Sequence, residues 1–422
     1  MEAQPLRCSV VVDSRNMHGQ GRKLFGRPHH VTVGGIRTGL RNLGFDVEDV
    51  HIGIATRTST PNPSQRLARM RDENIERAAT WRADGARVIE GMLAERRGDV
   101  EEKQVDVLCA LGIAELAVRK DPSTLVLLSE DMDLLPACQL ATKWGARAVT
   151  VAPRRVHERD GEHGWALLSP SDLAVTLGYS DPDRMVRLRR RAAEMLAQPS
   201  GRTLRHRVIG WDAKAQIARV ESNAGVIGQW AIGTRPEHGS KHDLHVVGAV
   251  AQARDLSAMP LMSLSETPAV DLHAVQRGVV SYWSRQDSIV VALDAGGTQG
   301  VSVPAGEPLL PGQPLLLLRT GRTTTYVGPL GDPVAPDSWP LRHLVGSGIV
   351  TGHTSTGHLL LNLCATDSQA EVLIPQTLSH QVRDPIPGAH VRLMLVGQHQ
   401  SGRPMCHPLS SGLTQPTSSS TA

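Results

Sequence analysis

Apolar residues in the first third of the chain form short continuous runs, and helical patterns lie between them. The runs have the length and the β-branched content of strands that are buried on both faces. They cover residues 9–12, 45–55, 124–129 and 146–151. The helical patterns cover residues 35–43, 64–93, 106–118, 134–144 and 167–178. This alternation predicts an α/β fold, with a parallel sheet flanked by helices, over residues 7–180.

From about residue 203 the pattern changes to short β runs separated by Gly and Pro. Two segments resemble each other, and in both the first glycine (Gly278, Gly348) lies 11 residues before the second β run. We therefore predict all-β, OB-like small-barrel repeats over 275–330 and 345–400, and a degenerate β module over 203–270. A basic helical linker is predicted over 181–202, and a Ser-, Thr- and Pro-rich tail over 410–422 is predicted to be disordered.

Composition narrows the class of protein. A chain of 422 residues with 40% hydrophobic residues can build two or three domains with real cores. Its five cysteines lie far apart without a CxxC pair, which favours buried thiols in a reducing cytoplasm over zinc or redox sites. The N-terminus has no signal-like pattern, and no apolar run is long enough to span a bilayer. We expect a soluble cytoplasmic protein with no membrane partner.

Acidic residues end two of the predicted strands. The run 124–129 is followed by Asp131 and Asp133, and the run 9–12 ends in Asp13, with Asn16 three residues later. Two carboxylates at the end of a buried strand are costly unless a cation or shared protons neutralise them. The carboxyl ends of parallel strands meet at one edge of a sheet, so these acids are expected to lie together. A fourth acid, Asp106, opens a predicted helix, where it is either another member of this cluster or a helix N-cap.

Three motifs in this order are similar to the NYN domain of the PIN-like nuclease superfamily. They are Val-Val-Asp13-x-x-Asn16, then Lys103-x-Val-Asp106 before a helix, and then a hydrophobic strand with Ser129-x-Asp131-x-Asp133. The resemblance covers roughly residues 7–152. The family usually has Gly between the Ser and the first Asp of the third motif, and here that position is Glu130. The extra acid either adds charge to the site or points away from it.

The resemblance implies a metal-dependent ribonuclease that hydrolyses RNA phosphodiester bonds, with DNA as a further substrate left open. Asp13, Asp106 and Asp131 would bind Mg²⁺ or Mn²⁺, and Asp133 would support the metal directly or through water. Asn16 and Ser129 would orient the ligands or the scissile phosphate. Carboxylates are hard oxygen ligands of the kind these ions prefer. The rival hypotheses are a non-catalytic RNA-binding or scaffold protein with a degenerate nuclease domain, and a phosphatase with an aspartyl nucleophile. Such a phosphatase needs its pair of acids at the end of the first strand, whereas here the pair follows a later strand.

Cations suggest where a polyanion would bind. Lys and Arg outnumber Asp and Glu in residues 1–207, whereas the acids slightly outnumber them in the rest of the chain. Residues 14–23 are predicted to form a mobile polar loop, which either holds a phosphate backbone or is merely solvated. The candidate nucleic-acid contacts in and beside it are Arg15, Arg22, Lys23 and Arg27. The arginines of 64–93 either line an RNA groove or form a solvated face, and those of the basic linker either contact nucleic acid or belong to a linker helix alone.

The sequence leaves two roles open for the β modules. Modules of this kind bind single strands through aromatic and cationic side chains, and Tyr282, Trp283 and Arg285 suit that use in one copy. The other interpretation is packing or contact with protein. Homo-oligomerisation stays open.

Overall fold

The computed structural model describes residues 5–25, 29–96, 99–119, 124–153, 163–197, 203–213, 215–250, 261–266, 275–285, 287–304, 306–320, 323–341, 344–364, 369–382 and 385–410. The chain divides into two compact units, one of residues 1–21, 29–180 and 336–422 and the other of residues 22–28 and 181–335. Within the described ranges, no helix is both long and apolar enough to cross a membrane.

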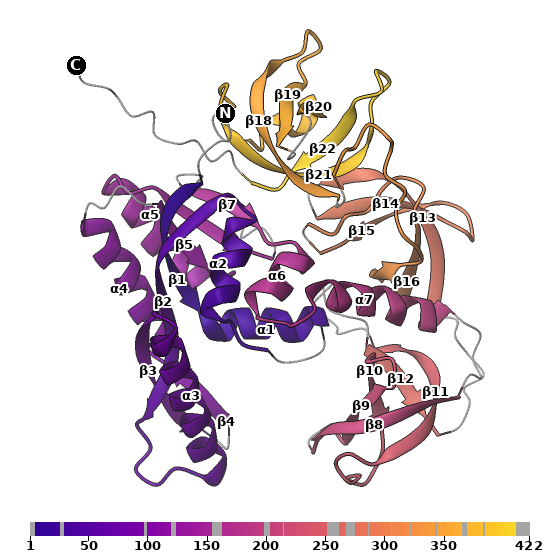
Figure 1. The fold of residues 1–422 in the computed structure, drawn as a ribbon. Helices are drawn as coiled ribbons and strands as arrows, with labels where there is room; N and C mark the ends of the chain where they lie inside the picture. Colours follow the sequence, from indigo (N-terminus) through magenta and orange to yellow (C-terminus); the bar gives the residue numbers. More distant parts are fainter. Residues whose placement is uncertain are drawn as a thin grey trace. The chain divides into compact units, whose positions relative to one another are not determined.

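A seven-stranded, mostly parallel sheet forms the centre of the first unit (Figure 1), in the order β4-β3-β2-β1-β5-β6-β7. β4 alone runs antiparallel, beside β3 at one edge. The strands are β1 Leu6–Asp13, β2 Phe45–Thr58, β3 Arg87–Arg96, β4 Asp99–Lys103, β5 Thr124–Leu128, β6 Ala148–Ala152 and β7 Gly164–Leu167. The helices are α1 Ser14–Phe25, α2 Val33–Arg41, α3 Gln65–Ala83, α4 Val105–Val118, η1 Met132–Leu134, α5 Leu135–Lys143 and α6 Pro170–Thr176. The predicted mixed α/β architecture with a parallel-containing sheet is confirmed.

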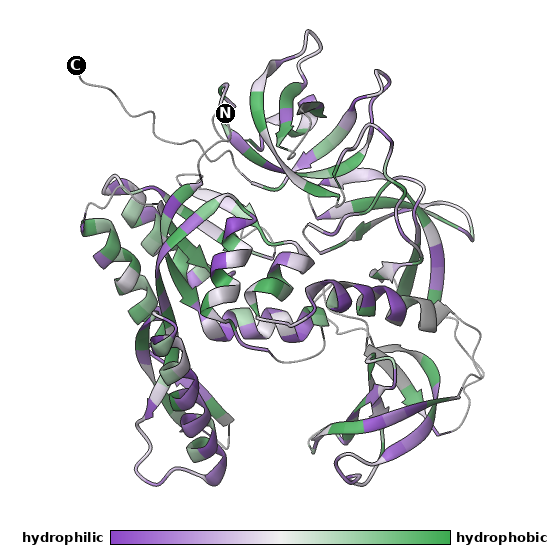
Figure 2. Cartoon of the chain, viewed as in Figure 1, coloured by the Kyte–Doolittle hydropathy of each residue, from purple (hydrophilic) through white to green (hydrophobic). Residues whose placement is uncertain are grey.

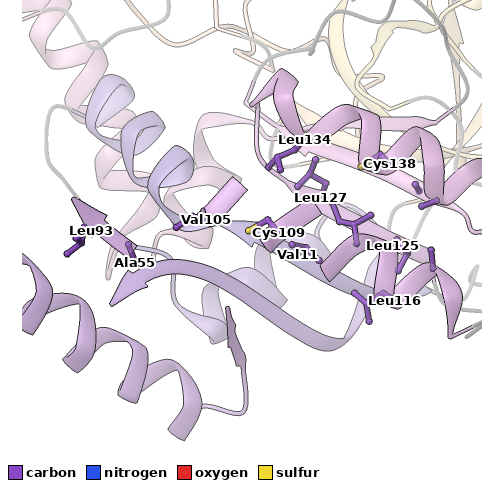
Figure 3. Close-up of a cluster of buried hydrophobic side chains, with 14 of the residues drawn as sticks. Val11, Ala55, Leu93, Val105, Cys109, Leu116, Leu125, Leu127, Leu134 and Cys138 are labelled. Atoms are coloured by element: carbon purple, nitrogen blue, oxygen red, sulfur yellow. The ribbon is translucent and has the colours of Figure 1, made fainter. Parts of the chain in front are cut away.

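Local sequence explains where several helices begin and end. Ser64 caps α3 by accepting from the N–H of Leu67, and Ser169 forms a capping box with Asp172 at the start of α6. Gly145, with φ +87°, ends α5 in a conformation that glycine adopts at little cost. One face of α4 packs on the sheet in a core that includes Val11, Cys109 and Leu127 (Figure 3).

Two parts of the sequence interpretation are wrong here. Residues 14–23 form most of α1 and not a mobile loop. A side chain at Gly21 would meet Leu177 Cδ1 at 2.4 Å, so glycine at this position serves the close packing of α1 rather than a turn. The helix predicted over 64–93 ends at Ala83, because Asp84 and Gly85 (φ +87°) terminate it, and β3 follows.

Three small β modules make up most of the remaining chain. The first is a closed barrel of β8 Thr203–Asp212, β9 Ile217–Ser222, β10 Ile227–Ala231, β11 Lys241–Val250 and β12 Leu261–Ser265. The second is a five-stranded sheet of β13 Val275–Arg285, β14 Ser288–Leu293, β15 Thr298–Ser302, β16 Pro314–Thr320 and β17 Thr323–Pro329. The third is a closed barrel of β18 Val345–His353, β19 Leu359–Cys364, β20 Gln369–Ile374, β21 His390–Gln398 and β22 Pro404–Pro408, with the short helix α8 Gln376–Ser379. The helix α7 Pro182–Ala197 precedes the first module.

The three modules share one strand order and one local irregularity. In each, the first strand pairs with the second and the fourth, and it carries a bulge directly after a buried valine. The N–H of a positive-φ glycine donates to the carbonyl of that valine at 2.8–2.9 Å. These pairs are Gly239 with Val208, Gly312 with Val280, and Gly388 with Val350. The repeat seen in the sequence therefore corresponds to a repeated five-stranded topology.

Candidate metal centre

Asp13 lies where the order of strands in the sheet reverses. β1 and β5 are neighbours, with β2 and β3 on one side and β6 and β7 on the other. In open α/β sheets, ligands bind beyond the carboxyl ends of the strands at such a switch point. Asp13 is the last residue of β1, and Asp131 follows three residues after the end of β5. The fold thus brings two predicted site residues to the edge where ligands are expected.

A short hydrogen-bond network fixes these two aspartates. Asp13 Oδ1 accepts from the N–H of Asn16 at 3.0 Å, and Asp13 Oδ2 lies 3.4 Å from the hydroxyl of Ser129. Ser129 Oγ also accepts from the N–H of Asp131 at 3.0 Å. Ser129 is fully buried, so its single hydroxyl links the ends of β1 and β5. Ser129 and the backbone of Asn16 therefore orient the acids.

Asp106 completes a group of three carboxylates. One carboxylate oxygen from each of Asp13, Asp106 and Asp131 lies within 4.8 Å of the other two. Asp106 stands in the first turn of α4, but the N-cap is Gln104, whose φ of 70° is left-handed and whose side chain makes no capping bond. The N-cap interpretation of Asp106 is therefore wrong. Asp106 instead extends from the start of the helix toward the two strand ends.

The electrostatics of this group are unfavourable without a cation. Asp13 is only 4% exposed, and burial together with the nearby Asp106 and Asp131 raises its pKa to about 6. Burial, Asp131 and Asp133 also raise the pKa of Asp106. Asp13 forms no ion pair with any residue in the described ranges. The donor set consists of carboxylate oxygens, which fits a hard divalent cation such as Mg²⁺ or Mn²⁺.

Asp133 lies outside the group of three. It is exposed, and its N–H donates to Asp131 Oδ1 at 3.0 Å, so it belongs to the turn that holds Asp131. Its carboxylate is near enough to raise the pKa of Asp106, but it is not among the oxygens that gather within 4.8 Å. The geometry fits a supporting position rather than a direct ligand.

Glu102 is an acid of this region that the sequence interpretation did not select. It lies on β4, and burial and Asp13 raise its pKa to about 7, although the Arg15 guanidinium opposes the shift. Arg15 Nη1 lies 4.0 Å from Glu102 Oε2. The only hint in the sequence was the pair Glu101-Glu102 before Lys103. The two glutamates alternate in environment, since Glu101 pairs at the surface with Lys103 Nζ at 2.7 Å.

Glu130 is not one of the three gathered carboxylates. Its carboxylate accepts a hydrogen bond from the side-chain amide of Gln20 on α1, and its N–H donates to Asn16 Oδ1 at 3.1 Å. Glu130 is 7% exposed and Gln20 is 5% exposed. The residue that replaces the expected glycine thus ties the β5 loop to α1.

The candidate nucleic-acid contacts are spread out. Arg15 stands in the first turn of α1, with half of its side chain exposed beside the acids. Arg22 and Lys23 stand in the last turn of α1, and Arg27 lies outside the described residues. In the second β module Tyr282 is 57% exposed, whereas the indole of Trp283 donates to the carbonyl of Leu309 at 2.8 Å and packs against the core. Arg15 is therefore the candidate cation at the acids, and Tyr282 is the candidate stacking surface.

No known protein-family model and no curated protein matches this chain. Among solved structures, the chain is similar to a multidomain protein with nucleic acid binding domains from Streptococcus pneumoniae TIGR4. The two are 10% identical, the match covers 49% of this chain and 72% of that chain, and the TM-score is 0.14. A TM-score at this level does not establish a common fold.

Proposed function

We propose that the N-terminal domain is a metal-dependent ribonuclease of the PIN-like, NYN type. The observation that carries the proposal is the meeting of Asp13, Asp106 and Asp131 within 4.8 Å at the switch point of the sheet. These residues come from three separate segments of the chain, and they are the acids of the three motifs that resemble the NYN domain. Acids brought together at such an edge, with one of them buried, are typical of a cation site.

Each side chain has a distinct part in this proposal. Asp13, Asp106 and Asp131 hold a Mg²⁺ or Mn²⁺ ion, and Ser129 with the Asn16 backbone fixes the direction of their oxygens. When bound, such an ion lowers the pKa of a water ligand and neutralises charge that develops on the phosphate. Arg15, half-exposed beside Glu102, is placed to pair with a phosphate oxygen of the RNA. Asp133 supports Asp131 through the turn.

The proposal is tested by incubating the full chain with end-labelled single-stranded RNA in Mn²⁺, and again in EDTA. Asp13→Asn and Asp131→Asn should each lower the cleavage rate on the order of 1,000-fold, because each removes one charged ligand. The matched control is Asp84→Asn, an exposed aspartate at the end of α3, which should cleave at the rate of the unaltered protein. Cleavage that survives EDTA, or that is undiminished in Asp13→Asn, rejects the assignment. RNA binding without any cleavage favours the non-catalytic alternative.

A further inference from the structure

The helix α4 carries apolar residues on the face opposite its buried one. Within its 14 residues, only Asp106 and Glu115 are charged. One face packs into the domain core through Val105, Cys109 and Ile113. On the opposite face Val107 is 63% exposed, Leu111 59% and Val118 64%. Figure 2 shows α4 as hydrophobic along most of its length.

The three exposed residues form one regular row with the partly buried Ala114. Val107, Leu111, Ala114 and Val118 follow one another at spacings of four, three and four residues. This is the spacing of the a and d positions of a coiled coil, where such residues pack against a second helix. The charged side chains lie beside the row, and Glu115 is paired with Arg87 at 3.3 Å and with Arg119 at 2.5 Å. The row therefore offers a seam that a helix can cover without burying a charge.

Neighbouring elements expose apolar side chains as well. α4 packs against η1 and α5, on which Met132 is 56% exposed and Leu140 is 40% exposed, and Trp144 at the end of α5 is 50% exposed. Of the ten large apolar side chains that are exposed in the described residues, six lie on α4, η1 and α5 or at their ends. Exposed Met and Trp side chains are enriched at protein interfaces.

The spacing of the row suits a second copy of the same helix. A spacing of four, three and four reads the same from both ends, so two antiparallel copies of α4 match each other. Val107 then meets Val118 of the second copy, and Leu111 meets Ala114, whose small side chain leaves room for the leucine. A two-fold contact of this kind uses the same surface on both chains and closes at a dimer. Antiparallel packing also places the positive end of each helix dipole beside the negative end of the other.

We propose that the protein is a homodimer in which α4 packs antiparallel against α4 of a second copy. The two Asp106 residues are then separated by 13 helical positions, or roughly 20 Å along the helix axis at 1.5 Å per residue. The dimer carries its two acid clusters at opposite ends of the paired helices.

The first test is sedimentation of the full chain over a range of concentrations. The unaltered protein should sediment as a dimer, and Leu111→Glu should raise the dissociation constant on the order of 100-fold or more, because each dimer loses two buried leucines and gains two carboxylates. Ile386→Glu is the matched control, since Ile386 is 56% exposed in a loop of the third β module. A monomer at all concentrations, or equal dissociation by both variants, overturns the proposal.

A second test fixes the direction of the helices. Val107→Cys and Val118→Cys are made separately with Cys364→Ser, because Cys364 is exposed and the other four cysteines are buried. The two proteins should form a disulfide only when mixed. In the antiparallel dimer, like positions lie about 16 Å apart along the axis, which is beyond the reach of a disulfide. A disulfide within Val107→Cys alone, or none in the mixture, overturns the antiparallel pairing.

Discussion

Two aspartates of the first unit are equally buried but have opposite surroundings. Asp13 and Asp172 are each 4% exposed. Asp172 accepts from the N–H and hydroxyl of Ser169, from the Asn42 amide at 3.2 Å and from the buried guanidinium of Arg392. Asp13 accepts from the N–H of Asn16 and the hydroxyl of Ser129, and its charged neighbours include two further carboxylates. The charge of Asp172 is neutralised within the chain, whereas Asp13 lies beside further negative charge.

This difference separates a structural carboxylate from the proposed metal ligand. Asp172 completes the capping box at the start of α6 and accepts from Arg392. Because Arg392 also donates to the carbonyl of Leu167 at 2.9 Å, this pair joins the third β module to the sheet domain within one compact unit. Such a charge is stabilising only while its partner is present. Asp13 contributes nothing of that kind, because its burial and neighbours make ionisation unfavourable. A buried acid that the fold itself does not neutralise is the one to expect at a functional site.

The largest expected effect is at Asp172, whose charge is neutralised by Arg392. Arg392→Met should destabilise the contact between β7 and β21 by about 3–5 kcal/mol, because it leaves Asp172 buried without its cation. Hydrogen exchange of the β7 and β21 amides should then be faster by about 100-fold or more. The control is Arg403→Met in the same module, whose pair with Glu371 is exposed and is worth about 1 kcal/mol at most. Equal exchange in the two variants would show that Asp172 does not depend on Arg392.

The next effect concerns the pH dependence of Asp13. Its pKa in the folded state is about 6, against the ordinary 3.8 of an aspartate, so the folded protein binds this proton more tightly than the unfolded chain does. Stability must therefore fall as pH rises from about 4 to above 6, by about 3 kcal/mol in total. The measurement is urea unfolding against pH in the presence of a chelator, compared with Asp13→Asn. The two proteins should converge below pH 4, and the variant should be the more stable at pH 7. A difference that does not vary with pH would mean that Asp13 ionises freely in the fold.

The sequence predicted the acids better than their surroundings. Asp13, Asp131 and Asp106 follow from strand ends and a helix start, which are local patterns. Glu102 was missed because the preceding stretch read as one long helix, and without β3 and β4 its position beside Asp13 has no basis. The partner of Asp172 lies 220 residues away, and no local pattern marks Arg392. α1 was missed because its glycines suggested a loop, whereas Gly21 serves close packing against Leu177.

A divalent cation should stabilise the protein through the site of Asp13 and not through that of Asp172. At a free Mn²⁺ concentration of 100 times the dissociation constant, binding to the folded state adds about 2.7 kcal/mol of stability. This gain should appear in the unaltered protein and in Arg403→Met, and it should be absent in Asp13→Asn. Calorimetric titration with Mn²⁺ gives the dissociation constant, and urea unfolding at pH 7 gives the gain. An equal gain in Asp13→Asn would place the cation elsewhere.

The smallest expected effect is at Glu130, a buried carboxylate that adjoins Asp131 in sequence. Because its side chain accepts from Gln20 and its backbone is bonded to Asn16, we assign it to the structural class. Glu130→Gln should change stability by about 1 kcal/mol or less, since the amide oxygen of the new glutamine can accept the same hydrogen bond while a buried charge is lost. It should also leave the Mn²⁺ dissociation constant within about threefold, a shift well below 1.4 kcal/mol. If Glu130 were a metal ligand, the same change would remove a charge from the ion and weaken binding tenfold or more. Asp131→Asn, one position away, is the comparison, because it should weaken Mn²⁺ binding while leaving the bonds of Glu130 to α1 in place.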